Sequence, residues 1–129
     1  MAFDKDFPAG DGTALVLGGS GGIGSAICTA LAEAGTDVAL TYHTNSEAAE
    51  KVVANIEVAG RSGAAFPLAM EDRAAVDETL QDVINRFGRI HTVVNASGSH
   101  IAMKFLGDIT PDELWRVMEA DTAGFYNVV

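Results

Sequence analysis

Short apolar runs alternate with amphipathic stretches along most of the chain. Residues 13–17 (TALVL) form a continuous apolar run that stops at glycines, which is typical of a strand buried on both faces. Further strands are predicted at residues 38–42, 64–69 and 90–95. Pro67 weakens the third of these strands, because proline cannot donate a ladder hydrogen bond.

Helices are predicted between and after these strands, where apolar residues recur three and four positions apart. Asn45 or Ser46 is positioned to cap the second helix and Asp72 the third, while residues 110–113 (TPDE) combine an N-cap threonine, a proline at the first helical position and a glutamate at the third. Glycines that end helices follow the first three, at Gly35, Gly60 and Gly88. The predicted packing faces are Ile23, Ala26, Ile27, Ala30, Leu31 and Ala34 in the first helix, Ala49, Val52, Val53, Ile56 and Ala59 in the second, Val76, Leu80, Val83, Ile84 and Phe87 in the third, and Leu114, Val117, Met118, Asp121 and Phe125 in the fourth.

The order β-α-β-α-β-α-β-α predicts an α/β fold with a Rossmann-type doubly wound parallel sheet. Right-handed crossovers place successive strands in one sheet with helices on both faces. A length of 129 residues suits a single domain spanning residues 1–129. Ligands of such folds bind beyond the carboxyl ends of the strands, so the candidate chemistry is sought there.

A glycine-rich segment joins the first strand to the first helix. Its Gly19, Gly21 and Gly24 match the G-x-G-x-x-G spacing. Glycines allow a tight turn and a close backbone approach to a pyrophosphate, while the helix offers unpaired N–H groups and its positive dipole end. The place between a strand and a helix favours this interpretation over a merely flexible turn. The predicted cofactor-binding residues here are Gly18, Gly19, Ser20, Gly21, Gly22, Ile23 and Gly24.

From about residue 13 to its end the chain resembles the short-chain dehydrogenase/reductase family. Gly18, Gly22 and Gly24 occupy the glycine positions of the family's T-G-x-x-x-G-x-G motif, and Leu17 replaces the threonine. The subgroup that the chain resembles most is the 3-oxoacyl-acyl-carrier-protein reductases. The resemblance implies a Rossmann-type fold, here only its N-terminal portion, and an oxidoreductase that uses NAD or NADP.

Two later segments carry the same resemblance. Residues 93–98 (VVNASG) are similar to the family's N-N-A-G motif at the fourth strand, which implies cofactor contacts from Asn95, Ala96, Ser97 and Gly98. Residues 113–125 resemble the helix with the family's structural and catalytic asparagine. There Asp121 stands at the asparagine's position, which makes it the catalytic candidate of this chain.

Asp121 allows two interpretations. It lies three residues after Met118 and four after Val117, so it shares the apolar face of the predicted helix, where an unpartnered carboxylate would be desolvated. Alternatively, it accepts hydrogen bonds from nearby backbone N–H groups at a helix irregularity that Gly124 permits. A proton-relay role would need a lysine partner that this chain does not supply.

The end of the second strand bears on the choice of dinucleotide. An NAD site of this type has a carboxylate there for the ribose hydroxyls, but residues 41–46 (TYHTNS) contain none. The side chains of His43, Thr44, Asn45 and Ser46 are therefore predicted to accommodate a 2′-phosphate, which favours NADP over NAD. An exposed loop histidine is the alternative interpretation of His43.

The family's catalytic serine and Y-x-x-x-K motif have no match in this chain. Its tyrosines, Tyr42 and Tyr126, are not followed by a lysine four residues later, and family members are roughly twice as long. The resemblance thus implies an NADP(H)-dependent oxidoreductase that interconverts a ketone and a secondary alcohol, of which this chain supplies the cofactor-binding half. The alternative is a non-catalytic dinucleotide-binding chain, or a truncated partner, that pairs with an active homologue. The resemblance also implies the family's strand order 3-2-1-4-5-6-7, in which this chain would leave its fourth strand as an exposed apolar edge. Such an edge favours a homo-oligomer or a complementary C-terminal chain as partner.

Composition and net charge bear on the partners, the cellular location and the metal binding that can be expected. With 8 basic and 18 acidic side chains the formal charge is −10, and such a field repels phosphate, which argues against nucleic-acid or anionic-membrane binding. The single cysteine, Cys28, cannot form an intrachain disulfide, which suits a reducing compartment. Residues 1–12 lack the order of a signal peptide, so a cytoplasmic location is expected. Three histidines and one cysteine at unrelated spacings predict no metal site.

Overall fold

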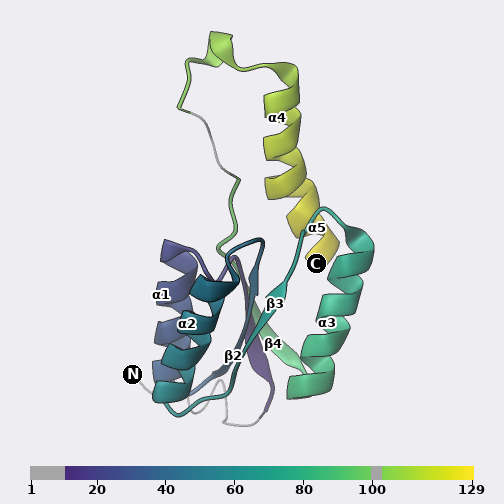
Figure 1. Cartoon of the computed structure of the whole chain (residues 1–129). Coiled ribbons are helices and arrows are strands. Elements are labelled where there is room, and N and C mark those ends of the chain that lie inside the picture. The colour runs from purple at the N-terminus through teal and green to yellow at the C-terminus, as the bar shows by residue number, and fades with distance from the viewer. Residues whose placement is uncertain (1–10, 100–102) are drawn as a thin grey trace.

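The computed structural model describes residues 11–99 and 103–129, and in them the strands form one parallel sheet. The four strands are β1 (Thr13–Leu17), β2 (Asp37–Tyr42), β3 (Gly63–Pro67) and β4 (Ile90–Asn95), in the spatial order β3-β2-β1-β4 (Figure 1). This arrangement confirms the predicted doubly wound α/β fold.

Helices cover both faces of the sheet. Figure 1 shows α1 (Gly22–Glu33) and α2 (Ser46–Val58) on one face, and α3 (Arg73–Phe87) and α5 (Gly124–Val128) on the other. Side chains alternate in direction along a strand, so β1 and β2 supply apolar residues to both layers and read as continuous apolar runs. Val16, Val38 and Leu40 pack under α1 and α2, whereas Leu15, Leu17 and Ala39 pack under α3 and α5.

The packing face of α1 differs from the prediction. Ile23 is 76% exposed, and Ala26 and Ala30 are also exposed, whereas the buried residues of this helix are Gly24, Cys28 and Ala32. These three lie four residues apart and have small side chains, so the helix approaches the sheet closely along them. The prediction followed the larger side chain of Ile23 and was wrong there, while its placement of Ile27, Leu31 and Ala34 against the core is confirmed.

The third strand also differs from its predicted bounds of 64–69. It begins one residue earlier, at Gly63, and ends at Pro67. The Leu68 N–H still donates to the Tyr42 carbonyl, at 2.8 Å, before the chain turns toward α3. Pro67 is tolerated because β3 lies at an edge of the sheet, where a missing donor faces no neighbouring strand.

The last predicted helix is interrupted in the structure. A short 3₁₀ turn, η1 (Leu106–Asp108), precedes α4 (Pro111–Met118), which continues through a π-helical segment, η2 (Glu119–Ala123), into α5. The predicted Thr110 cap is confirmed as a capping box with Glu113. The predicted packing face of this last helix is confirmed only at its C-terminal end, where Phe125 packs against the core. Its earlier part, α4, extends beyond the sheet (Figure 1), and there Leu114 is 51% and Met118 42% exposed.

The start of α4 should respond to pH through Glu113. Hydrogen bonds from Lys104 and from Thr110 lower the pKa of its carboxyl to about 2, against an ordinary 4.5. A carboxylate with a lowered pKa stabilises the fold above its ordinary pKa, and this contribution is lost as pH falls from 4.5 toward 2. We expect Lys104→Met to raise the Glu113 midpoint in an NMR titration of the side-chain carboxyl.

The matched control is Lys51→Met, which removes an ion pair of 2.7 Å to Glu47 on α2. This variant should leave the Glu113 midpoint unchanged. A Glu113 midpoint near 4.5 in the unmodified chain would contradict the lowered pKa.

Candidate functional site

The glycine-rich loop between β1 and α1 is tied to the end of β2. Gly18 has a φ of +71°, a left-handed conformation that glycine adopts without strain. Its N–H donates to the Thr41 hydroxyl at 3.1 Å, and the Gly19 N–H donates to the Thr41 carbonyl at 2.9 Å. Thr41 is 2% exposed, so this anchor is buried beneath the loop. The loop is therefore held in place where parallel sheets of this type bind ligands.

The glycines of this loop meet very different surroundings. A Cβ atom at Gly24 would overlap the Gly18 carbonyl oxygen, and one at Gly19 would lie 2.5 Å from the Leu40 Cβ, so both positions require glycine for packing. A Cβ atom at Gly22, in contrast, would meet no atom within 4 Å. The backbone at Gly22 thus borders open space that a ligand can occupy.

Backbone donors face this open space. The first intrahelical hydrogen bond of α1 runs from the Ser25 N–H to the Gly21 carbonyl, at 2.8 Å. The N–H groups of Gly22, Ile23 and Gly24 precede it and have no intrahelical acceptor, and Gly21, the N-cap, has no side chain to accept from them. Together with the positive end of the helix dipole, these donors fit a pyrophosphate. The Ile23 side chain beside them is exposed.

Cys28 lies directly under the loop. Its Sγ is 4.0 Å from the Gly19 carbonyl oxygen, and burial raises the pKa of the thiol to about 12. The neutral thiol is a poor nucleophile. Cys28 is therefore a packing residue of the core beneath the loop.

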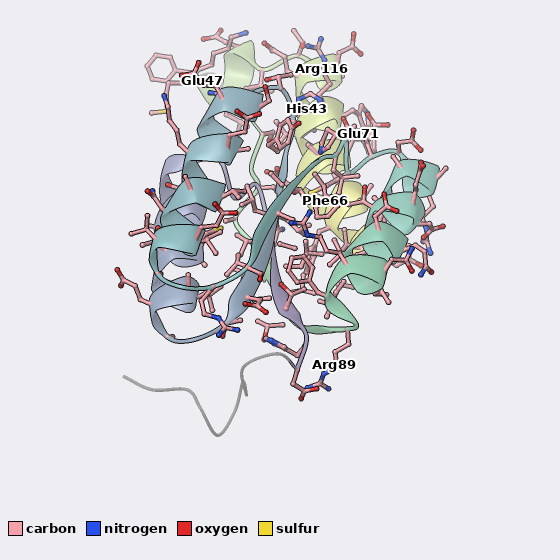
Figure 2. All side chains as sticks on the ribbon, turned by 60° about the horizontal axis from the view of Figure 1, so that its bottom comes forward. His43, Glu47, Phe66, Glu71, Arg89 and Arg116 are labelled. Atoms are coloured by element: carbon pink, nitrogen blue, oxygen red, sulfur yellow. The ribbon has the colours of Figure 1, made fainter. Side chains whose placement is uncertain are left out.

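A pocket of about 380 Å³ opens beside the loop, beyond the carboxyl ends of the strands. One side is formed by His43 after β2 and by the segment that follows β3. The other side is formed by residues after β4 and by η2. Figure 2 shows His43 and Glu71 at the same end of the molecule, with Arg89 at the opposite end. The lining residues are His43, Leu68, Ala69, Met70, Glu71, Ser97, Gly98, Ser99, Ala120 and Asp121.

The structure brings some of the predicted site residues together and separates others. His43, Ser97 and Gly98 line the pocket, and the glycine loop touches its edge, because a Cβ atom at Gly18 would lie 2.7 Å from the Ser97 Cα. The remaining predicted residues, Thr44, Asn45, Ser46, Asn95 and Ala96, lie beside the pocket but do not line it.

The side-chain amides of Asn45 and Asn95 form hydrogen bonds that fix the local backbone. The Asn45 Oδ1 accepts the Ala48 N–H at 3.0 Å and so caps α2, as one of the two predicted cap residues. The Asn95 Oδ1 accepts both the Ser97 N–H, at 3.2 Å, and the Ser97 hydroxyl, at 2.6 Å. Asn95 thereby shapes the segment that borders the pocket, while the Nδ2 group of Asn45 remains available at the start of α2.

One interpretation of the sequence placed Asp121 on an apolar helix face, where its carboxylate would be desolvated. The structure contradicts that interpretation. Asp121 is exposed on η2, and its Oδ1 accepts the Ser99 N–H at 2.9 Å. The widened π-helical turn directs this carboxylate toward the segment after β4. The alternative interpretation is confirmed in part: the carboxylate accepts a backbone N–H at a helix irregularity, but the donor, Ser99, lies in a distant segment of the chain and not nearby.

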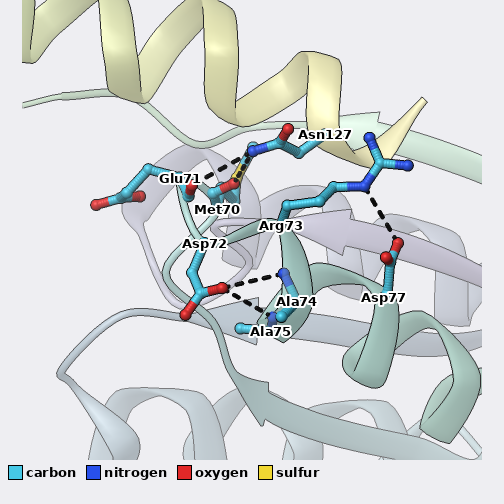
Figure 3. A network of polar contacts seen from close by, with 8 residues as sticks. All are labelled: Met70, Glu71, Asp72, Arg73, Ala74, Ala75, Asp77 and Asn127. Carbon is cyan, nitrogen blue, oxygen red and sulfur yellow. Dashed lines mark hydrogen bonds and ion pairs between the residues drawn. The ribbon is translucent and has the colours of Figure 1, made fainter.

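Two contributors to the site were missed by the sequence analysis. The Thr41 hydroxyl anchors Gly18, and its position two residues before His43 offered a weak signal. Asn127 of α5 donates from its Nδ2 to the carbonyl oxygens of Met70 and Glu71, at 3.0 and 3.5 Å (Figure 3). Nothing in the periodicity of the sequence indicates that Asn127 contacts these two carbonyls.

The described residues contain neither a metal-ion cluster nor a membrane-spanning helix. Across residues 11–99 and 103–129, no three His, Cys, Asp or Glu side chains are arranged to hold a metal ion. In the same part of the chain, no helix is both long and apolar enough to cross a bilayer.

Comparison with known proteins gives consistent matches over nearly the whole chain. The sequence profile of the family described as short chain dehydrogenase matches residues 12–129. Versicolorin reductase 1 of Aspergillus parasiticus is 35% identical over 115 residues, which cover 89% of this chain and 44% of that protein. The chain therefore spans less than half the length of this relative.

Solved structures show the same partial coverage. A short chain dehydrogenase from Burkholderia cenocepacia in complex with NADP is 37% identical, with a TM-score of 0.84 over 93% of this chain and 48% of the other. An NAD+-bound xylitol dehydrogenase is 32% identical, with a TM-score of 0.86 over 93% of this chain and 45% of the other. The similarity thus covers the part of each structure that corresponds to β1 through α5.

Proposed function

The chain belongs to the short-chain dehydrogenase family, and on this premise we propose that it forms the NADP(H)-binding half of a reductase. The observation that carries the proposal is the open space at Gly22, bordered by the N–H groups at the start of α1. That geometry suits the pyrophosphate of a dinucleotide. In this proposal, residues 1–129 form one dinucleotide-binding domain, and the residues that contact the cofactor are those predicted from the sequence.

The proposed preference for NADP rests on the end of β2. No carboxylate follows Tyr42 until Glu47, so nothing there is suited to the free ribose hydroxyls of NAD. His43 lines the pocket, and the hydroxyls of Thr44 and Ser46 stand beside it as donors for a 2′-phosphate. The NADP-bound structure from Burkholderia cenocepacia and the NAD+-bound xylitol dehydrogenase are similar to this chain to nearly the same extent, so the proposed preference rests on the end of β2.

The proposed reaction interconverts a ketone and a secondary alcohol. A bound nicotinamide supplies or accepts the hydride. This chain's part is to hold the pyrophosphate at the glycine loop and the adenosine half in the pocket. The family's serine and Y-x-x-x-K motif have no counterpart among these 129 residues, so the proposal assigns the proton donor to a continuation of the chain or to a partner chain. We propose a 3-oxoacyl compound as substrate, following the subgroup resemblance.

His43→Asp should reverse the nucleotide preference. The unmodified chain is expected to bind NADPH more tightly than NADH, because imidazole and hydroxyl donors meet the 2′-phosphate. An aspartate at this position repels the phosphate and accepts from ribose hydroxyls, so NADPH should bind about tenfold more weakly, ~1.4 kcal/mol. Calorimetric titration of both nucleotides measures the change.

The control is His43→Asn, which keeps a neutral donor and should retain the NADPH preference. Tighter binding of NADH by the unmodified chain would contradict the assigned cofactor. Binding of neither nucleotide would contradict the proposed function itself.

A further inference from the structure

The segment after β3 forms one side of the pocket, and its two ends are fixed by the fold. At its start the Leu68 N–H donates to the Tyr42 carbonyl, at 2.8 Å. At its end the Asp72 side chain caps α3 by accepting the N–H groups of Ala74 and Ala75, at 3.0 and 3.2 Å (Figure 3). Met70 and Glu71, which line the pocket, lie between these two anchors.

Asn127 supports the middle of this segment. Its Nδ2 donates to the Met70 carbonyl at 3.0 Å and approaches the Glu71 carbonyl at 3.5 Å, across more than fifty positions of sequence. The Asn127 side chain is the link drawn between the segment after β3 and the last helix in Figure 3. A single amide thus fixes the backbone at the pocket wall.

The helix that carries Asn127 is itself well placed to act as a support. Gly124 is buried, and a Cβ atom there would lie 3.1 Å from the Met70 Cβ, so glycine permits the close approach. Phe125 and Val128 pack on the core cluster that contains Met70. One turn earlier, Asp121 accepts the Ser99 N–H at 2.9 Å. The helical stretch from η2 to α5 therefore contacts the pocket wall after β3 as well as the wall after β4.

We propose that Asn127 is a positioning residue for the adenosine half of the dinucleotide, an inference that rests on the proposed function. In doubly wound folds the adenosine ribose lies at the end of the second strand, which here is the His43 side of the pocket. The base then lies against Met70 and Glu71. Asn127 touches neither the base nor the ribose. It acts by setting the position of the two carbonyls, and hence the width of the space that receives the base.

The test compares the two halves of the cofactor as separate probes. In the full chain, Asn127→Leu removes the donor while keeping a similar volume. We expect this variant to bind NADPH and adenosine 2′,5′-bisphosphate five- to tenfold more weakly, by the same factor for both. Binding of nicotinamide mononucleotide should be unchanged. Asn127→Ser, which is too small to clash, should show the same pattern and serves if the leucine variant does not fold.

Arg86→Met is the matched control. Arg86 Nη2 donates to the Gly63 carbonyl at 3.2 Å, so this change also removes a side-chain bond to the β3 region, but at the opposite end of the strand. Whatever its effect on the melting temperature, the control should leave all three affinities unchanged. Equal weakening of both cofactor halves in the Asn127 variants, or no weakening of either, overturns the positioning role. Either outcome leaves the proposed function standing as long as the unmodified chain binds NADPH. If the unmodified chain does not bind NADPH, both the positioning role and the proposed function are overturned.

Discussion

Gly24→Ala should destabilise the chain by about 3 kcal/mol, at the upper end of the range for overpacking a close contact. The added Cβ would overlap the Gly18 carbonyl oxygen and would lie 2.8 Å from the Gly19 Cα. These are backbone atoms, and the hydrogen bonds of Gly18 and Gly19 to Thr41 prevent the loop from moving aside cheaply. The free energy of unfolding from urea titration measures the loss.

Gly107→Ala provides the control for this prediction. Gly107 lies in η1, its Cβ would meet no atom within 4 Å, and it does not have a positive φ. Its stability should therefore remain within about 0.5 kcal/mol of the unmodified chain. A similarly small effect for Gly24→Ala would show that α1 and the loop are not in close contact.

The strands and the helix caps could be predicted because the residues that determine them lie close together in the sequence. The fourth strand was predicted at its observed bounds, since Ile90 follows a helix-ending glycine and the apolar run stops at Asn95. Caps at Asp72 and Thr110 were likewise predictable, because each side chain accepts from backbone N–H groups that are at most three residues away, within one turn. The observed strand order β3-β2-β1-β4 agrees with the order that the family resemblance implies.

The orientation of helices was harder to predict, because it depends on distances between elements. Periodicity placed Ile23 on the buried face, but the close approach of α1 to the sheet admits only the small residues Gly24, Cys28 and Ala32 there. The π-helical turn at η2 rotates the following residues relative to α4, so one regular stripe could not describe both.

In the candidate site, too, the local features could be predicted from the sequence and the long-range contacts could not. The glycine loop could be predicted because its glycine spacing stands between a clear strand and a clear helix, and the two together specify a turn, a close approach and a helix start. The anchor at Thr41 and the support from Asn127 join residues that are 23 and 57 positions apart, and no pattern within one element encodes such pairs. The sequence therefore predicts where the phosphates of a dinucleotide would bind, while the structure shows how the adjacent pocket is held.

Gly22→Val should weaken dinucleotide binding by at least tenfold, ~1.4 kcal/mol, without lowering stability. Its Cβ would meet no atom of the described chain within 4 Å, and the residue does not have a positive φ, so the folded chain accommodates the side chain. The added methyl groups occupy the space through which a pyrophosphate reaches the N–H groups of α1. Calorimetric titration with NADPH and thermal unfolding of the same sample separate the two effects. Gly22→Ala should give a smaller loss of affinity in the same direction, because it fills less of that space. Undiminished affinity in the valine variant would place the pyrophosphate elsewhere than at this loop.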